Sequence, residues 1–268
     1  MINGDAYGGV LDLSSNYWGT TDLNTIIELT YNPTVIEDEP GVFITLAQGL
    51  VDTSPYLFRP NDMDTNTPGF QGDFARLYVH AQSAQTTENI NEALGVFDTT
   101  DTQNWMEIIN GNYTEDVIVD IPANVRGEFV LDGTFMMTEN AKTLKPGSPS
   151  DPTAIIQTNG FTAQTGSWVM LNIDGTTPGT QFDQIIVNGT VDISNANLFI
   201  TPTYTAATDE ELVIIDNDGT DPIIGKFFDR PEGSIISVYN GETDTTYHYY
   251  ITYQGGDGND VVLYTNHT

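Results

Sequence analysis

The feature that most constrains the fold of this chain is a succession of short apolar segments, each ended by a cluster of turn-forming residues. Val, Ile and aromatic residues dominate the segments and Gly, Pro, Asn and Asp fill the breaks, as is typical of short strands joined by tight turns. The clearest segments are RLYVHA (76–81), WMEII (105–109), EDVIVD (115–120), EFVLDG (128–133), TAIIQT (153–158), WVMLNI (168–173) and QIIVNGTVDI (184–193). The sequence therefore predicts an all-β protein, either a stack of β-coils or a β-sandwich.

Two stretches have the signals of short helices. LNTIIELTYN (23–32) follows Thr21 and Asp22, and either residue is a suitable N-cap. In TTENINEALGVFD (86–98), Thr87 is the expected N-cap, an acidic residue follows it, and apolar residues recur at helical spacing. The sequence therefore predicts two short helices, one within residues 23–32 and one within residues 86–98.

A large excess of acidic residues limits the partners. Thirty-eight Asp and Glu residues oppose seven Lys and Arg residues, so the formal net charge is −31 at pH 7. Such a surface repels nucleic acid and anionic membranes, and it favours cations, basic proteins or neutral glycans. The absence of Cys excludes disulfides and thiolate chemistry. Because of the acidic charge, we expect no nucleic-acid binding. No apolar run approaches the roughly 18 residues that a membrane span needs, so we also expect no membrane insertion.

Three stretches resemble parts of known bacterial surface proteins. NYWGTTD (16–22), followed by VDTSPYL (51–57), resembles the end of right-handed β-helix domains in large surface proteins. ENINEALGVFD, MEIINGNYTEDVIVD and NVRGEFVLDG, within 88–133, resemble the first coils of pectate-lyase-like β-helices, where a short capping helix leads into the first strands. The segment 182–264 is similar to the terminal part of autotransporter-like β-solenoid proteins, whereas residues 134–180 match none of these motifs.

The resemblance implies an all-β fold: a right-handed parallel β-helix (β-solenoid) with a β-rich C-terminal cap. It divides the chain into the C-terminal coils of a preceding β-helix (1–58), a polar linker (59–75), a second short β-helix with an N-terminal capping helix (76–193) and a C-terminal β cap (194–268). Because the ends of stacked coils expose unpaired backbone groups, a helix at one end and a hairpin at the other are the expected covers. An extracellular or cell-surface location is also implied, and we expect the chain to be part of a longer exported protein.

Two Asp-rich loops that contain Gly are candidate calcium sites. GGDGNDVV (255–262), between the strand-like YHYYITYQ and VVLY, matches one copy of the nonapeptide Ca²⁺-binding repeat. IIDNDGTDP (214–222) gathers the carboxylates that Ca²⁺ prefers. Plain turns are the alternative, and we favour them: a Gly-rich hairpin turn in the first loop and an Asx-rich turn in the second. Ca²⁺ is thus the candidate cofactor, with predicted ligands Asp216, Asp218, Asp221, Asp257 and Asp260, and a further pair at Asp62 and Asp64.

The chain offers little for catalysis. β-Helix polysaccharide lyases use a basic residue as the base, and residues 77–193 of the second predicted β-helix hold only Arg126, Lys142 and Lys145. We expect Arg126 to lie at a turn and to have a surface or stacking role. No spacing typical of a metal site or a catalytic triad links the three histidines, which are His80, His248 and His267. We therefore predict a non-catalytic protein, with a polysaccharide lyase or glycoside hydrolase as the alternative.

An aromatic segment near the C-terminus raises a third functional alternative. Alternation places Tyr247, Tyr249 and Tyr253 on one face of a strand and His248 and Tyr250 on the other. Exposed, the tyrosines would form a platform for sugar rings; buried, they would fill a core, which we favour. The leading hypothesis is a structural or adhesive segment of a secreted or cell-surface bacterial protein. Its partners would be glycans or host or cell-surface proteins, and the alternative is a glycan-binding module without turnover.

Overall fold

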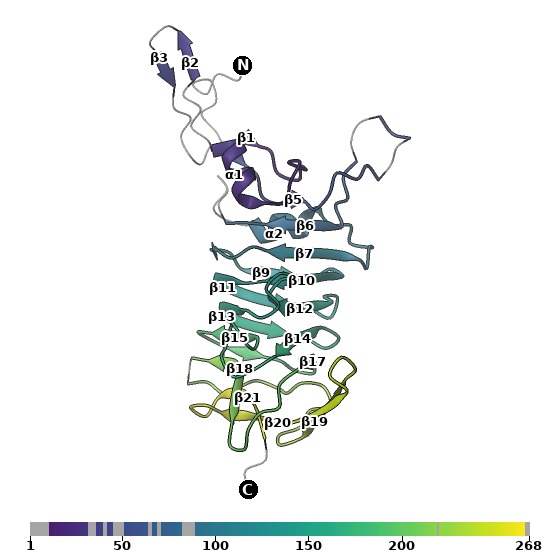
Figure 1. The fold of residues 1–268 in the computed structure, drawn as a ribbon, viewed down its shortest axis with the longest axis vertical. Coiled ribbons are helices and arrows are strands. Elements are labelled where there is room, and N and C mark those ends of the chain that lie inside the picture. Colours follow the sequence, from purple (N-terminus) through teal and green to yellow (C-terminus); the bar gives the residue numbers. More distant parts are fainter. Residues whose placement is uncertain are drawn as a thin grey trace.

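The computed structural model describes residues 11–31, 36–39, 42–44, 51–63, 66–68, 71–81, 89–218 and 220–265 (Figure 1). Strands hold 44% of the residues and helices 7%, so the predicted all-β class is confirmed. The helices are α1 (Leu23–Tyr31) and α2 (Asn89–Val96). The strands that precede α2 are β1 (Leu11–Asp12), β2 (Ile36–Glu39), β3 (Val42–Ile44), β4 (Val51–Asp52), β5 (Tyr56–Leu57) and β6 (Arg76–Val79). The strands that follow α2 are β7 (Asn104–Ile108), β8 (Asn112–Tyr113), β9 (Val117–Val119), β10 (Ala123–Gly127), β11 (Phe129–Met137), β12 (Thr143–Pro146), β13 (Ile155–Ala163), β14 (Trp168–Ile173), β15 (Gln184–Val187), β16 (Val191–Asp192), β17 (Asn197–Pro202), β18 (Glu211–Asn217), β19 (Ile235–Asn240), β20 (Thr245–Gly255) and β21 (Asp260–Tyr264).

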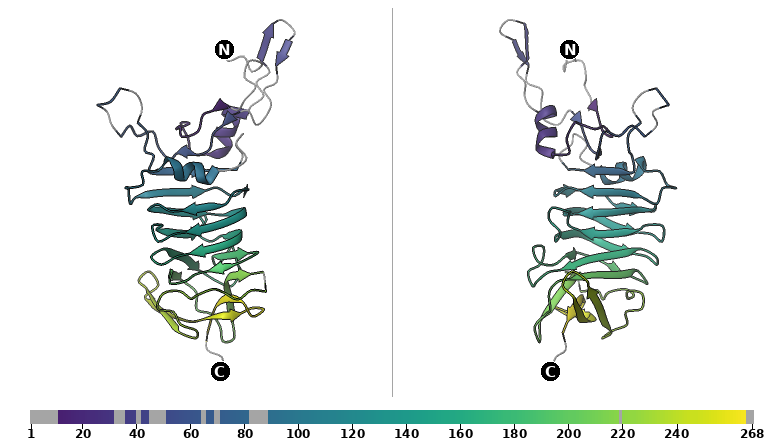
Figure 2. Two further views of the ribbon diagram at one scale, coloured as in Figure 1. Left: turned by 180° about the vertical axis from the view of Figure 1, so that it is seen from behind. Right: turned by 45° about the vertical axis from the view of Figure 1, so that its right-hand side comes forward.

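Two large sheets form the body of the molecule. The seven-stranded sheet has the order β17-β14-β12-β10-β7-β6-β5, and the ten-stranded sheet has the order β19-β20-β21-β18-β15-β13-β11-β8, with β9 beside β11 and β16 beside β13. From β7 to β18 the chain crosses repeatedly from one sheet to the other, and every strand pairing within this stretch is parallel. The strands consequently stack along the long axis of the molecule (Figures 1 and 2).

Rows of apolar side chains fill the space between the two sheets. Alternate residues of each strand point inward, and register places equivalent residues of neighbouring strands side by side. In the seven-stranded sheet one buried row holds Leu77, Met106, Val125, Leu144, Val169 and Leu198. In the ten-stranded sheet another buried row holds Phe129, Ile156, Ile185 and Ile215. Residues 134–180, which match no motif in the sequence, contribute to both rows and belong to the same stack.

A carboxylate binds the N-terminus of each helix. Of the two predicted caps of α1, Asp22 is the one that accepts a backbone N–H and a hydroxyl from the first turn. The predicted cap of α2, Thr87, lies outside the described residues. At the N-terminus of α2, the buried Glu115 carboxylate accepts the N–H groups of Ile90 at 2.9 Å and Asn91 at 3.0 Å. A negative charge at a helix N-terminus is favourable, so Glu115 joins α2 to the strands that follow it.

Residues 59–75 connect β5 to β6, which pair in an antiparallel manner within the seven-stranded sheet. Met63 N–H donates to the Gln71 carbonyl at 2.8 Å, and Arg59 Nε lies 3.7 Å from the Asp73 carboxylate. The strands on either side of the predicted linker thus belong to one sheet. The division of the chain into domains stays a prediction.

The C-terminal strands form an antiparallel group at one end of the ten-stranded sheet. β21 pairs with both β18 and β20, and β19 pairs with β20, so the predicted hairpin is confirmed. Tyr247, Tyr249 and Tyr253 are buried on one face of β20, while His248 is exposed on the other. The core-filling interpretation is therefore confirmed, and these tyrosines form no exposed platform.

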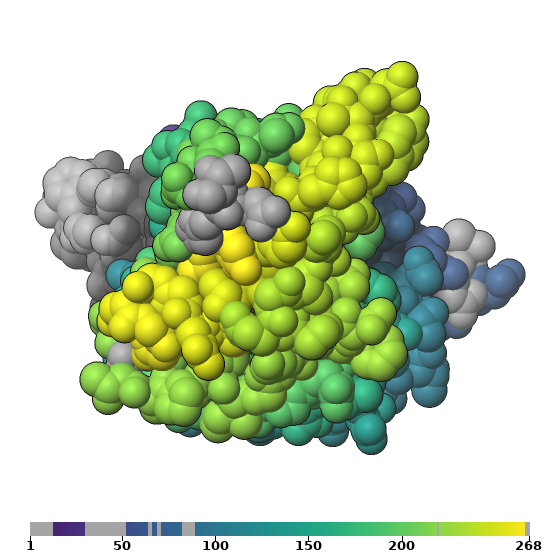
Figure 3. Space-filling view, turned by 90° about the horizontal axis from the view of Figure 1, so that it is seen from below, coloured from purple at the N-terminus to yellow at the C-terminus, as the bar shows by residue number. Residues whose placement is uncertain are grey.

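Residues of β19 and β20 also bond to the chain at the end of β17, the edge strand of the seven-stranded sheet. The Tyr247 hydroxyl donates to the carbonyl of Thr203 at 3.1 Å, and the Tyr249 hydroxyl donates to the next carbonyl. Asn240 Nδ2 donates to the carbonyl of Pro202 at 2.9 Å. Figure 3 shows this segment spread across the end of the molecule. These bonds satisfy backbone groups that an open sheet edge would leave unpaired.

A buried carboxylate joins β14 to the segments that precede β13 and β15, and it makes the stability of the fold pH-dependent. Asp183, directly before β15, is fully buried and accepts the N–H groups of Ala154 at 2.9 Å and Asn172 at 2.7 Å. Burial raises its pKa to about 7, above the value in the unfolded chain. The folded state therefore binds more protons than the unfolded state between about pH 4 and 7, and this contribution to stability is lost as the pH rises.

We therefore expect wild type to lose stability relative to Asp183→Asn as the pH rises from 5 to 8. Chemical denaturation of both proteins across this range measures the difference in their free energies of unfolding. Comparison with the variant removes the contribution of His80, which is buried and whose pKa is lowered to about 4 by burial in both proteins. A pH-independent difference would contradict the assignment.

Candidate functional site

Outward-facing side chains of the seven-stranded sheet form two rows along the molecule. One row holds Arg76, Trp105, Asn124, Thr143, Trp168 and Asn197 on successive strands from β6 to β17. The neighbouring row holds Tyr78, Glu107, Arg126 and Lys145. Three of the chain's seven basic residues thus gather on one face, whereas the outward positions of the ten-stranded sheet include Asp132, Asp192 and Asp216. The two faces of this acidic molecule therefore differ in local charge.

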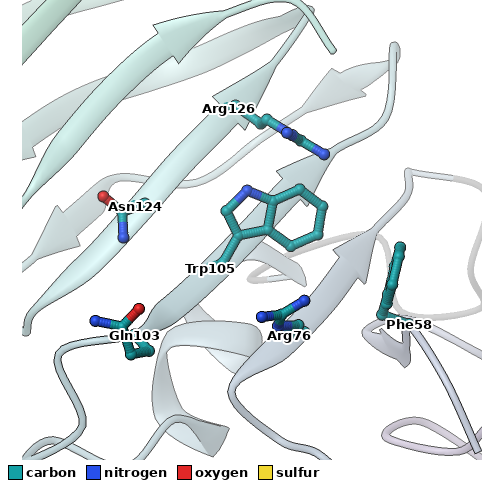
Figure 4. Close-up of a pocket in the computed structure, with 6 residues that line it drawn as sticks. All are labelled: Phe58, Arg76, Gln103, Trp105, Asn124 and Arg126. Carbon is teal, nitrogen blue, oxygen red and sulfur yellow. The ribbon is translucent and has the colours of Figure 1, made fainter. Parts of the chain in front are cut away.

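Trp105 is the centre of a shallow depression on the first of these faces. The depression has a volume of about 310 Å³ and is lined by Phe58, Arg76, Gln103, Trp105, Asn124 and Arg126. The Arg126 guanidinium lies 3.9 Å from the centre of the Trp105 ring, and Phe58 meets the ring edge-on at 6.0 Å. In Figure 4 the indole lies between the two guanidinium groups. Aromatic rings and cations thus occur together in one accessible hollow.

The two guanidinium groups of the depression have different surroundings. Nε and Nη2 of Arg126 both donate to Glu107 Oε2, at 2.9 and 2.7 Å, so one side of this guanidinium is already occupied. Arg76 is exposed, and within the described part of the chain its side chain has no hydrogen bond or ion pair. Arg76 therefore has five N–H donors with which to bind a ligand that enters the depression.

Two amides complete the polar lining. Asn124 Nδ2 donates to the carbonyl of Asn104 at 3.1 Å, which orients the Asn124 side chain beside Trp105. Gln103 is exposed at the start of β7. An aromatic ring, an unpaired guanidinium and side-chain amides can together hold a ligand with an apolar ring face and several hydroxyl or acid oxygens.

Of the basic residues considered from the sequence, Arg126 alone lines this depression. Its predicted stacking role is confirmed by the contact with Trp105, but its predicted position at a turn is wrong, because it lies within β10. Lys145 lies beside Arg126 on β12, and Lys142 directly precedes that strand. The other lining residues are not predicted from the sequence, since they are brought together by pairing between distant strands.

The two histidines that the structure describes, His80 and His248, lie in separate surroundings. His80 is buried with its Nε2 3.0 Å from Thr53 Oγ1, and its backbone N–H donates to Ser54 Oγ. Because Thr53 and Ser54 are also fully buried, this cluster is a hydrogen-bond network without access for a substrate. His248 contacts Ser237 on the exposed face of β20, at 2.8 Å between Nδ1 and Oγ. His267 lies outside the described residues.

The two predicted calcium loops lie against each other. Asn217 N–H donates to Asp260 Oδ1 at 2.8 Å, and Asn259 Nδ2 donates to the carbonyls of Asn217 and Asp221. Burial and the neighbouring carboxylates Asp218 and Asp257 raise the pKa of Asp216. Burial also raises the pKa of Asp260. The structure thus brings together two loops that the sequence treats separately.

Calcium binding at this cluster stays a prediction. Within the described ranges, no group of three or more His, Cys, Asp or Glu side chains is arranged to hold a metal ion. Asp62 accepts the N–H of Gln71 at 3.4 Å, and Asp64 lies outside the described residues. Melting curves with calcium and with a chelator test the prediction: a bound ion raises the midpoint, and an unchanged midpoint would contradict binding.

Comparisons with protein-family models, with curated proteins and with solved structures found no match to this chain. Among the described residues, no helix is long and apolar enough to cross a membrane.

Proposed function

We propose that this chain is a non-catalytic, glycan-binding segment of an extracellular, cell-surface protein, built as a right-handed parallel β-helix with a C-terminal β cap. Repeated parallel crossings between two sheets and rows of stacked side chains support the β-helix. Parallel crossover connections are right-handed in about 98% of cases, which supports the hand. The resemblance of the sequence to surface β-solenoids supports the location. In this proposal the stacked strands form a stiff support that displays the binding face.

The depression at Trp105 is the observation that carries the proposal. The C–H face of a sugar ring packs well against an aromatic ring, whose face is electron-rich. Arg76 can donate to two oxygen atoms of one sugar, and the Gln103 and Asn124 amides can both donate and accept. An open site on a rigid sheet suits a sugar, because the Asn124 and Arg126 side chains are already held beside Trp105 before binding.

Binding without turnover is supported by the contacts that Glu107 and Arg126 already make with other groups of the protein. Glu107, the carboxylate beside the depression, receives two hydrogen bonds from Arg126. Arg126 in turn is stacked on Trp105. Both groups are thus used to fix the shape of the depression, which leaves Arg76 to contact the ligand.

A glycan array probed with wild type and Arg76→Ala tests this function. A hydrogen bond to a charged group contributes about 1.5–3 kcal/mol, so we expect wild type to bind a subset of glycans and the variant to bind them roughly tenfold or more weakly. Lys226→Ala is the control, because it removes the same charge from an exposed residue of the C-terminal segment. Absence of binding to any glycan, or equal binding by Arg76→Ala, would contradict the proposal.

A further inference from the structure

A second aromatic hollow lies at the other end of the same sheet face. Phe199 points outward from β17 and is 43% exposed, and Tyr239 on β19 is 64% exposed. Between them is a groove of about 260 Å³. Its polar lining comes from Thr201, Thr203, Asn240 and Glu242. The groove therefore combines exposed aromatic rings with hydroxyl, amide and carboxylate groups.

The groove has a defined shape because the hairpin that forms one wall is bonded to the sheet. Asn240 Nδ2 donates to the carbonyl of Pro202 at 2.9 Å, at the end of β17. The Tyr239 hydroxyl donates to Asp244 Oδ1 at 2.9 Å, which orients the ring across the turn of the hairpin. Figure 1 shows the β19–β20 hairpin beside β17. The hairpin wall that carries Tyr239 is thus fixed by a hydrogen bond to the end of β17 and by another across its own turn.

The groove and the Trp105 depression share one line of strands. Trp105 and Phe199 both point outward from the seven-stranded sheet, on β7 and β17, and β10, β12 and β14 lie between them. Neighbouring strands are about 4.8 Å apart, so the two sites are separated by about 19 Å along the stack. Trp168, which is 42% exposed, occupies the row of Trp105 between them. Aromatic residues therefore lie on this outward face at β7, β14 and β17, half-buried at Trp105 and exposed at Trp168 and Phe199.

We infer that the Phe199–Tyr239 groove is a second sugar subsite, and that the ligand is a linear polysaccharide lying across the strands from Trp105 to Tyr239. The inference rests on the proposed glycan-binding function and names the form of its ligand. Continuity with the Trp105 depression identifies the occupant, since both hollows open on the same outward sheet face and both combine aromatic rings with side-chain amides. Engaging two subsites with one chain converts the second contact into an intramolecular event, which raises affinity without altering either subsite.

Calorimetric titration with cello-, xylo-, chito- and galacturono-oligosaccharides of two to eight residues tests the inference. We expect the affinity of wild type for the series it binds to rise by about tenfold or more once the chain spans both subsites. The variant Phe199→Ala/Tyr239→Ala, and Tyr239→Ala alone, should lose this gain while binding the shortest oligosaccharide as wild type does. Phe228→Ala is the matched control, because Phe228 is an exposed aromatic residue of the same segment outside the groove.

The outcomes separate the inference from the function on which it rests. Binding that is independent of chain length, or a length gain that survives in both variants, would overturn the second subsite and leave glycan binding at Trp105 intact. Absence of binding at every length in all four series would overturn both. Equal melting midpoints for wild type and the variants would show that the fold is unchanged.

Discussion

Replacing Trp105 by alanine is expected to weaken glycan binding by about 30-fold, which corresponds to about 2 kcal/mol for a central aromatic contact. The substitution removes the ring on which the sugar would lie. It also removes the surface on which the Arg126 guanidinium rests at 3.9 Å, and the edge-on contacts with Phe58 and Tyr78. The substitution therefore removes the aromatic surface of the depression and the contacts that keep its neighbouring side chains in position. Calorimetric titration with the oligosaccharides that wild type binds measures the effect.

Two further variants isolate the role of the Trp105 ring. Trp105→Phe keeps an aromatic face and should retain part of the affinity. Val130→Ala removes a partly exposed apolar side chain from the outward face of the ten-stranded sheet and should leave binding unchanged. Unchanged affinity in Trp105→Ala, with an intact fold by circular dichroism, would place the binding site elsewhere.

Replacing Leu144 by alanine is expected to lower the free energy of unfolding by about 2–5 kcal/mol. Leu144 is fully buried on β12, between Val125 on β10 and Val169 on β14. Because the stack holds a residue on both sides of it, neighbouring strands cannot close the resulting cavity without breaking their own register. Chemical denaturation monitored by circular dichroism measures the loss.

The matched control for Leu144 is its neighbour on the same strand. Thr143→Ala changes an outward-facing side chain, so its effect should stay within about 0.5 kcal/mol. Equal effects of the two substitutions would contradict the inward and outward assignment of β12, and with it the stacked arrangement of the two sheets.

Local pattern was sufficient to predict several elements. Asp22 before an apolar helical run predicts the start of α1, and alternation in β20 predicts that Tyr247, Tyr249 and Tyr253 share a face and fill the core. Both features depend on residues close in sequence, whose geometry is set by the backbone of one element. The β20–β21 hairpin around a Gly-rich turn was predicted for the same reason.

The Trp105 depression could not be predicted in this way. Its lining comes from β5 to β10, so Phe58 and Asn124 become neighbours only through strand pairing and register. A shift of one residue in that register would turn Trp105 toward the core and remove the site. Alternation within WMEII places Trp105 and Glu107 on one face, but it does not say which residues of other strands lie beside them.

Net charge gave an incomplete guide to the ligand for a similar reason. A charge of −31 describes the chain as a whole, whereas Arg76, Arg126 and Lys145 are far apart in sequence and gather on one face of the fold. Local potential at a site depends on the charges within about one Debye length, roughly 8 Å at physiological salt. The local charge at this face therefore depends on these cations and Glu107 more than on the total.

A crystal structure with the oligosaccharide that binds most tightly is the most direct test of the account. We predict a sugar ring in van der Waals contact with Trp105, at about 4 Å, and a hydrogen bond from the Arg76 guanidinium to a sugar oxygen. A bound sugar on any other surface, with the Trp105 depression empty, would contradict the proposed function.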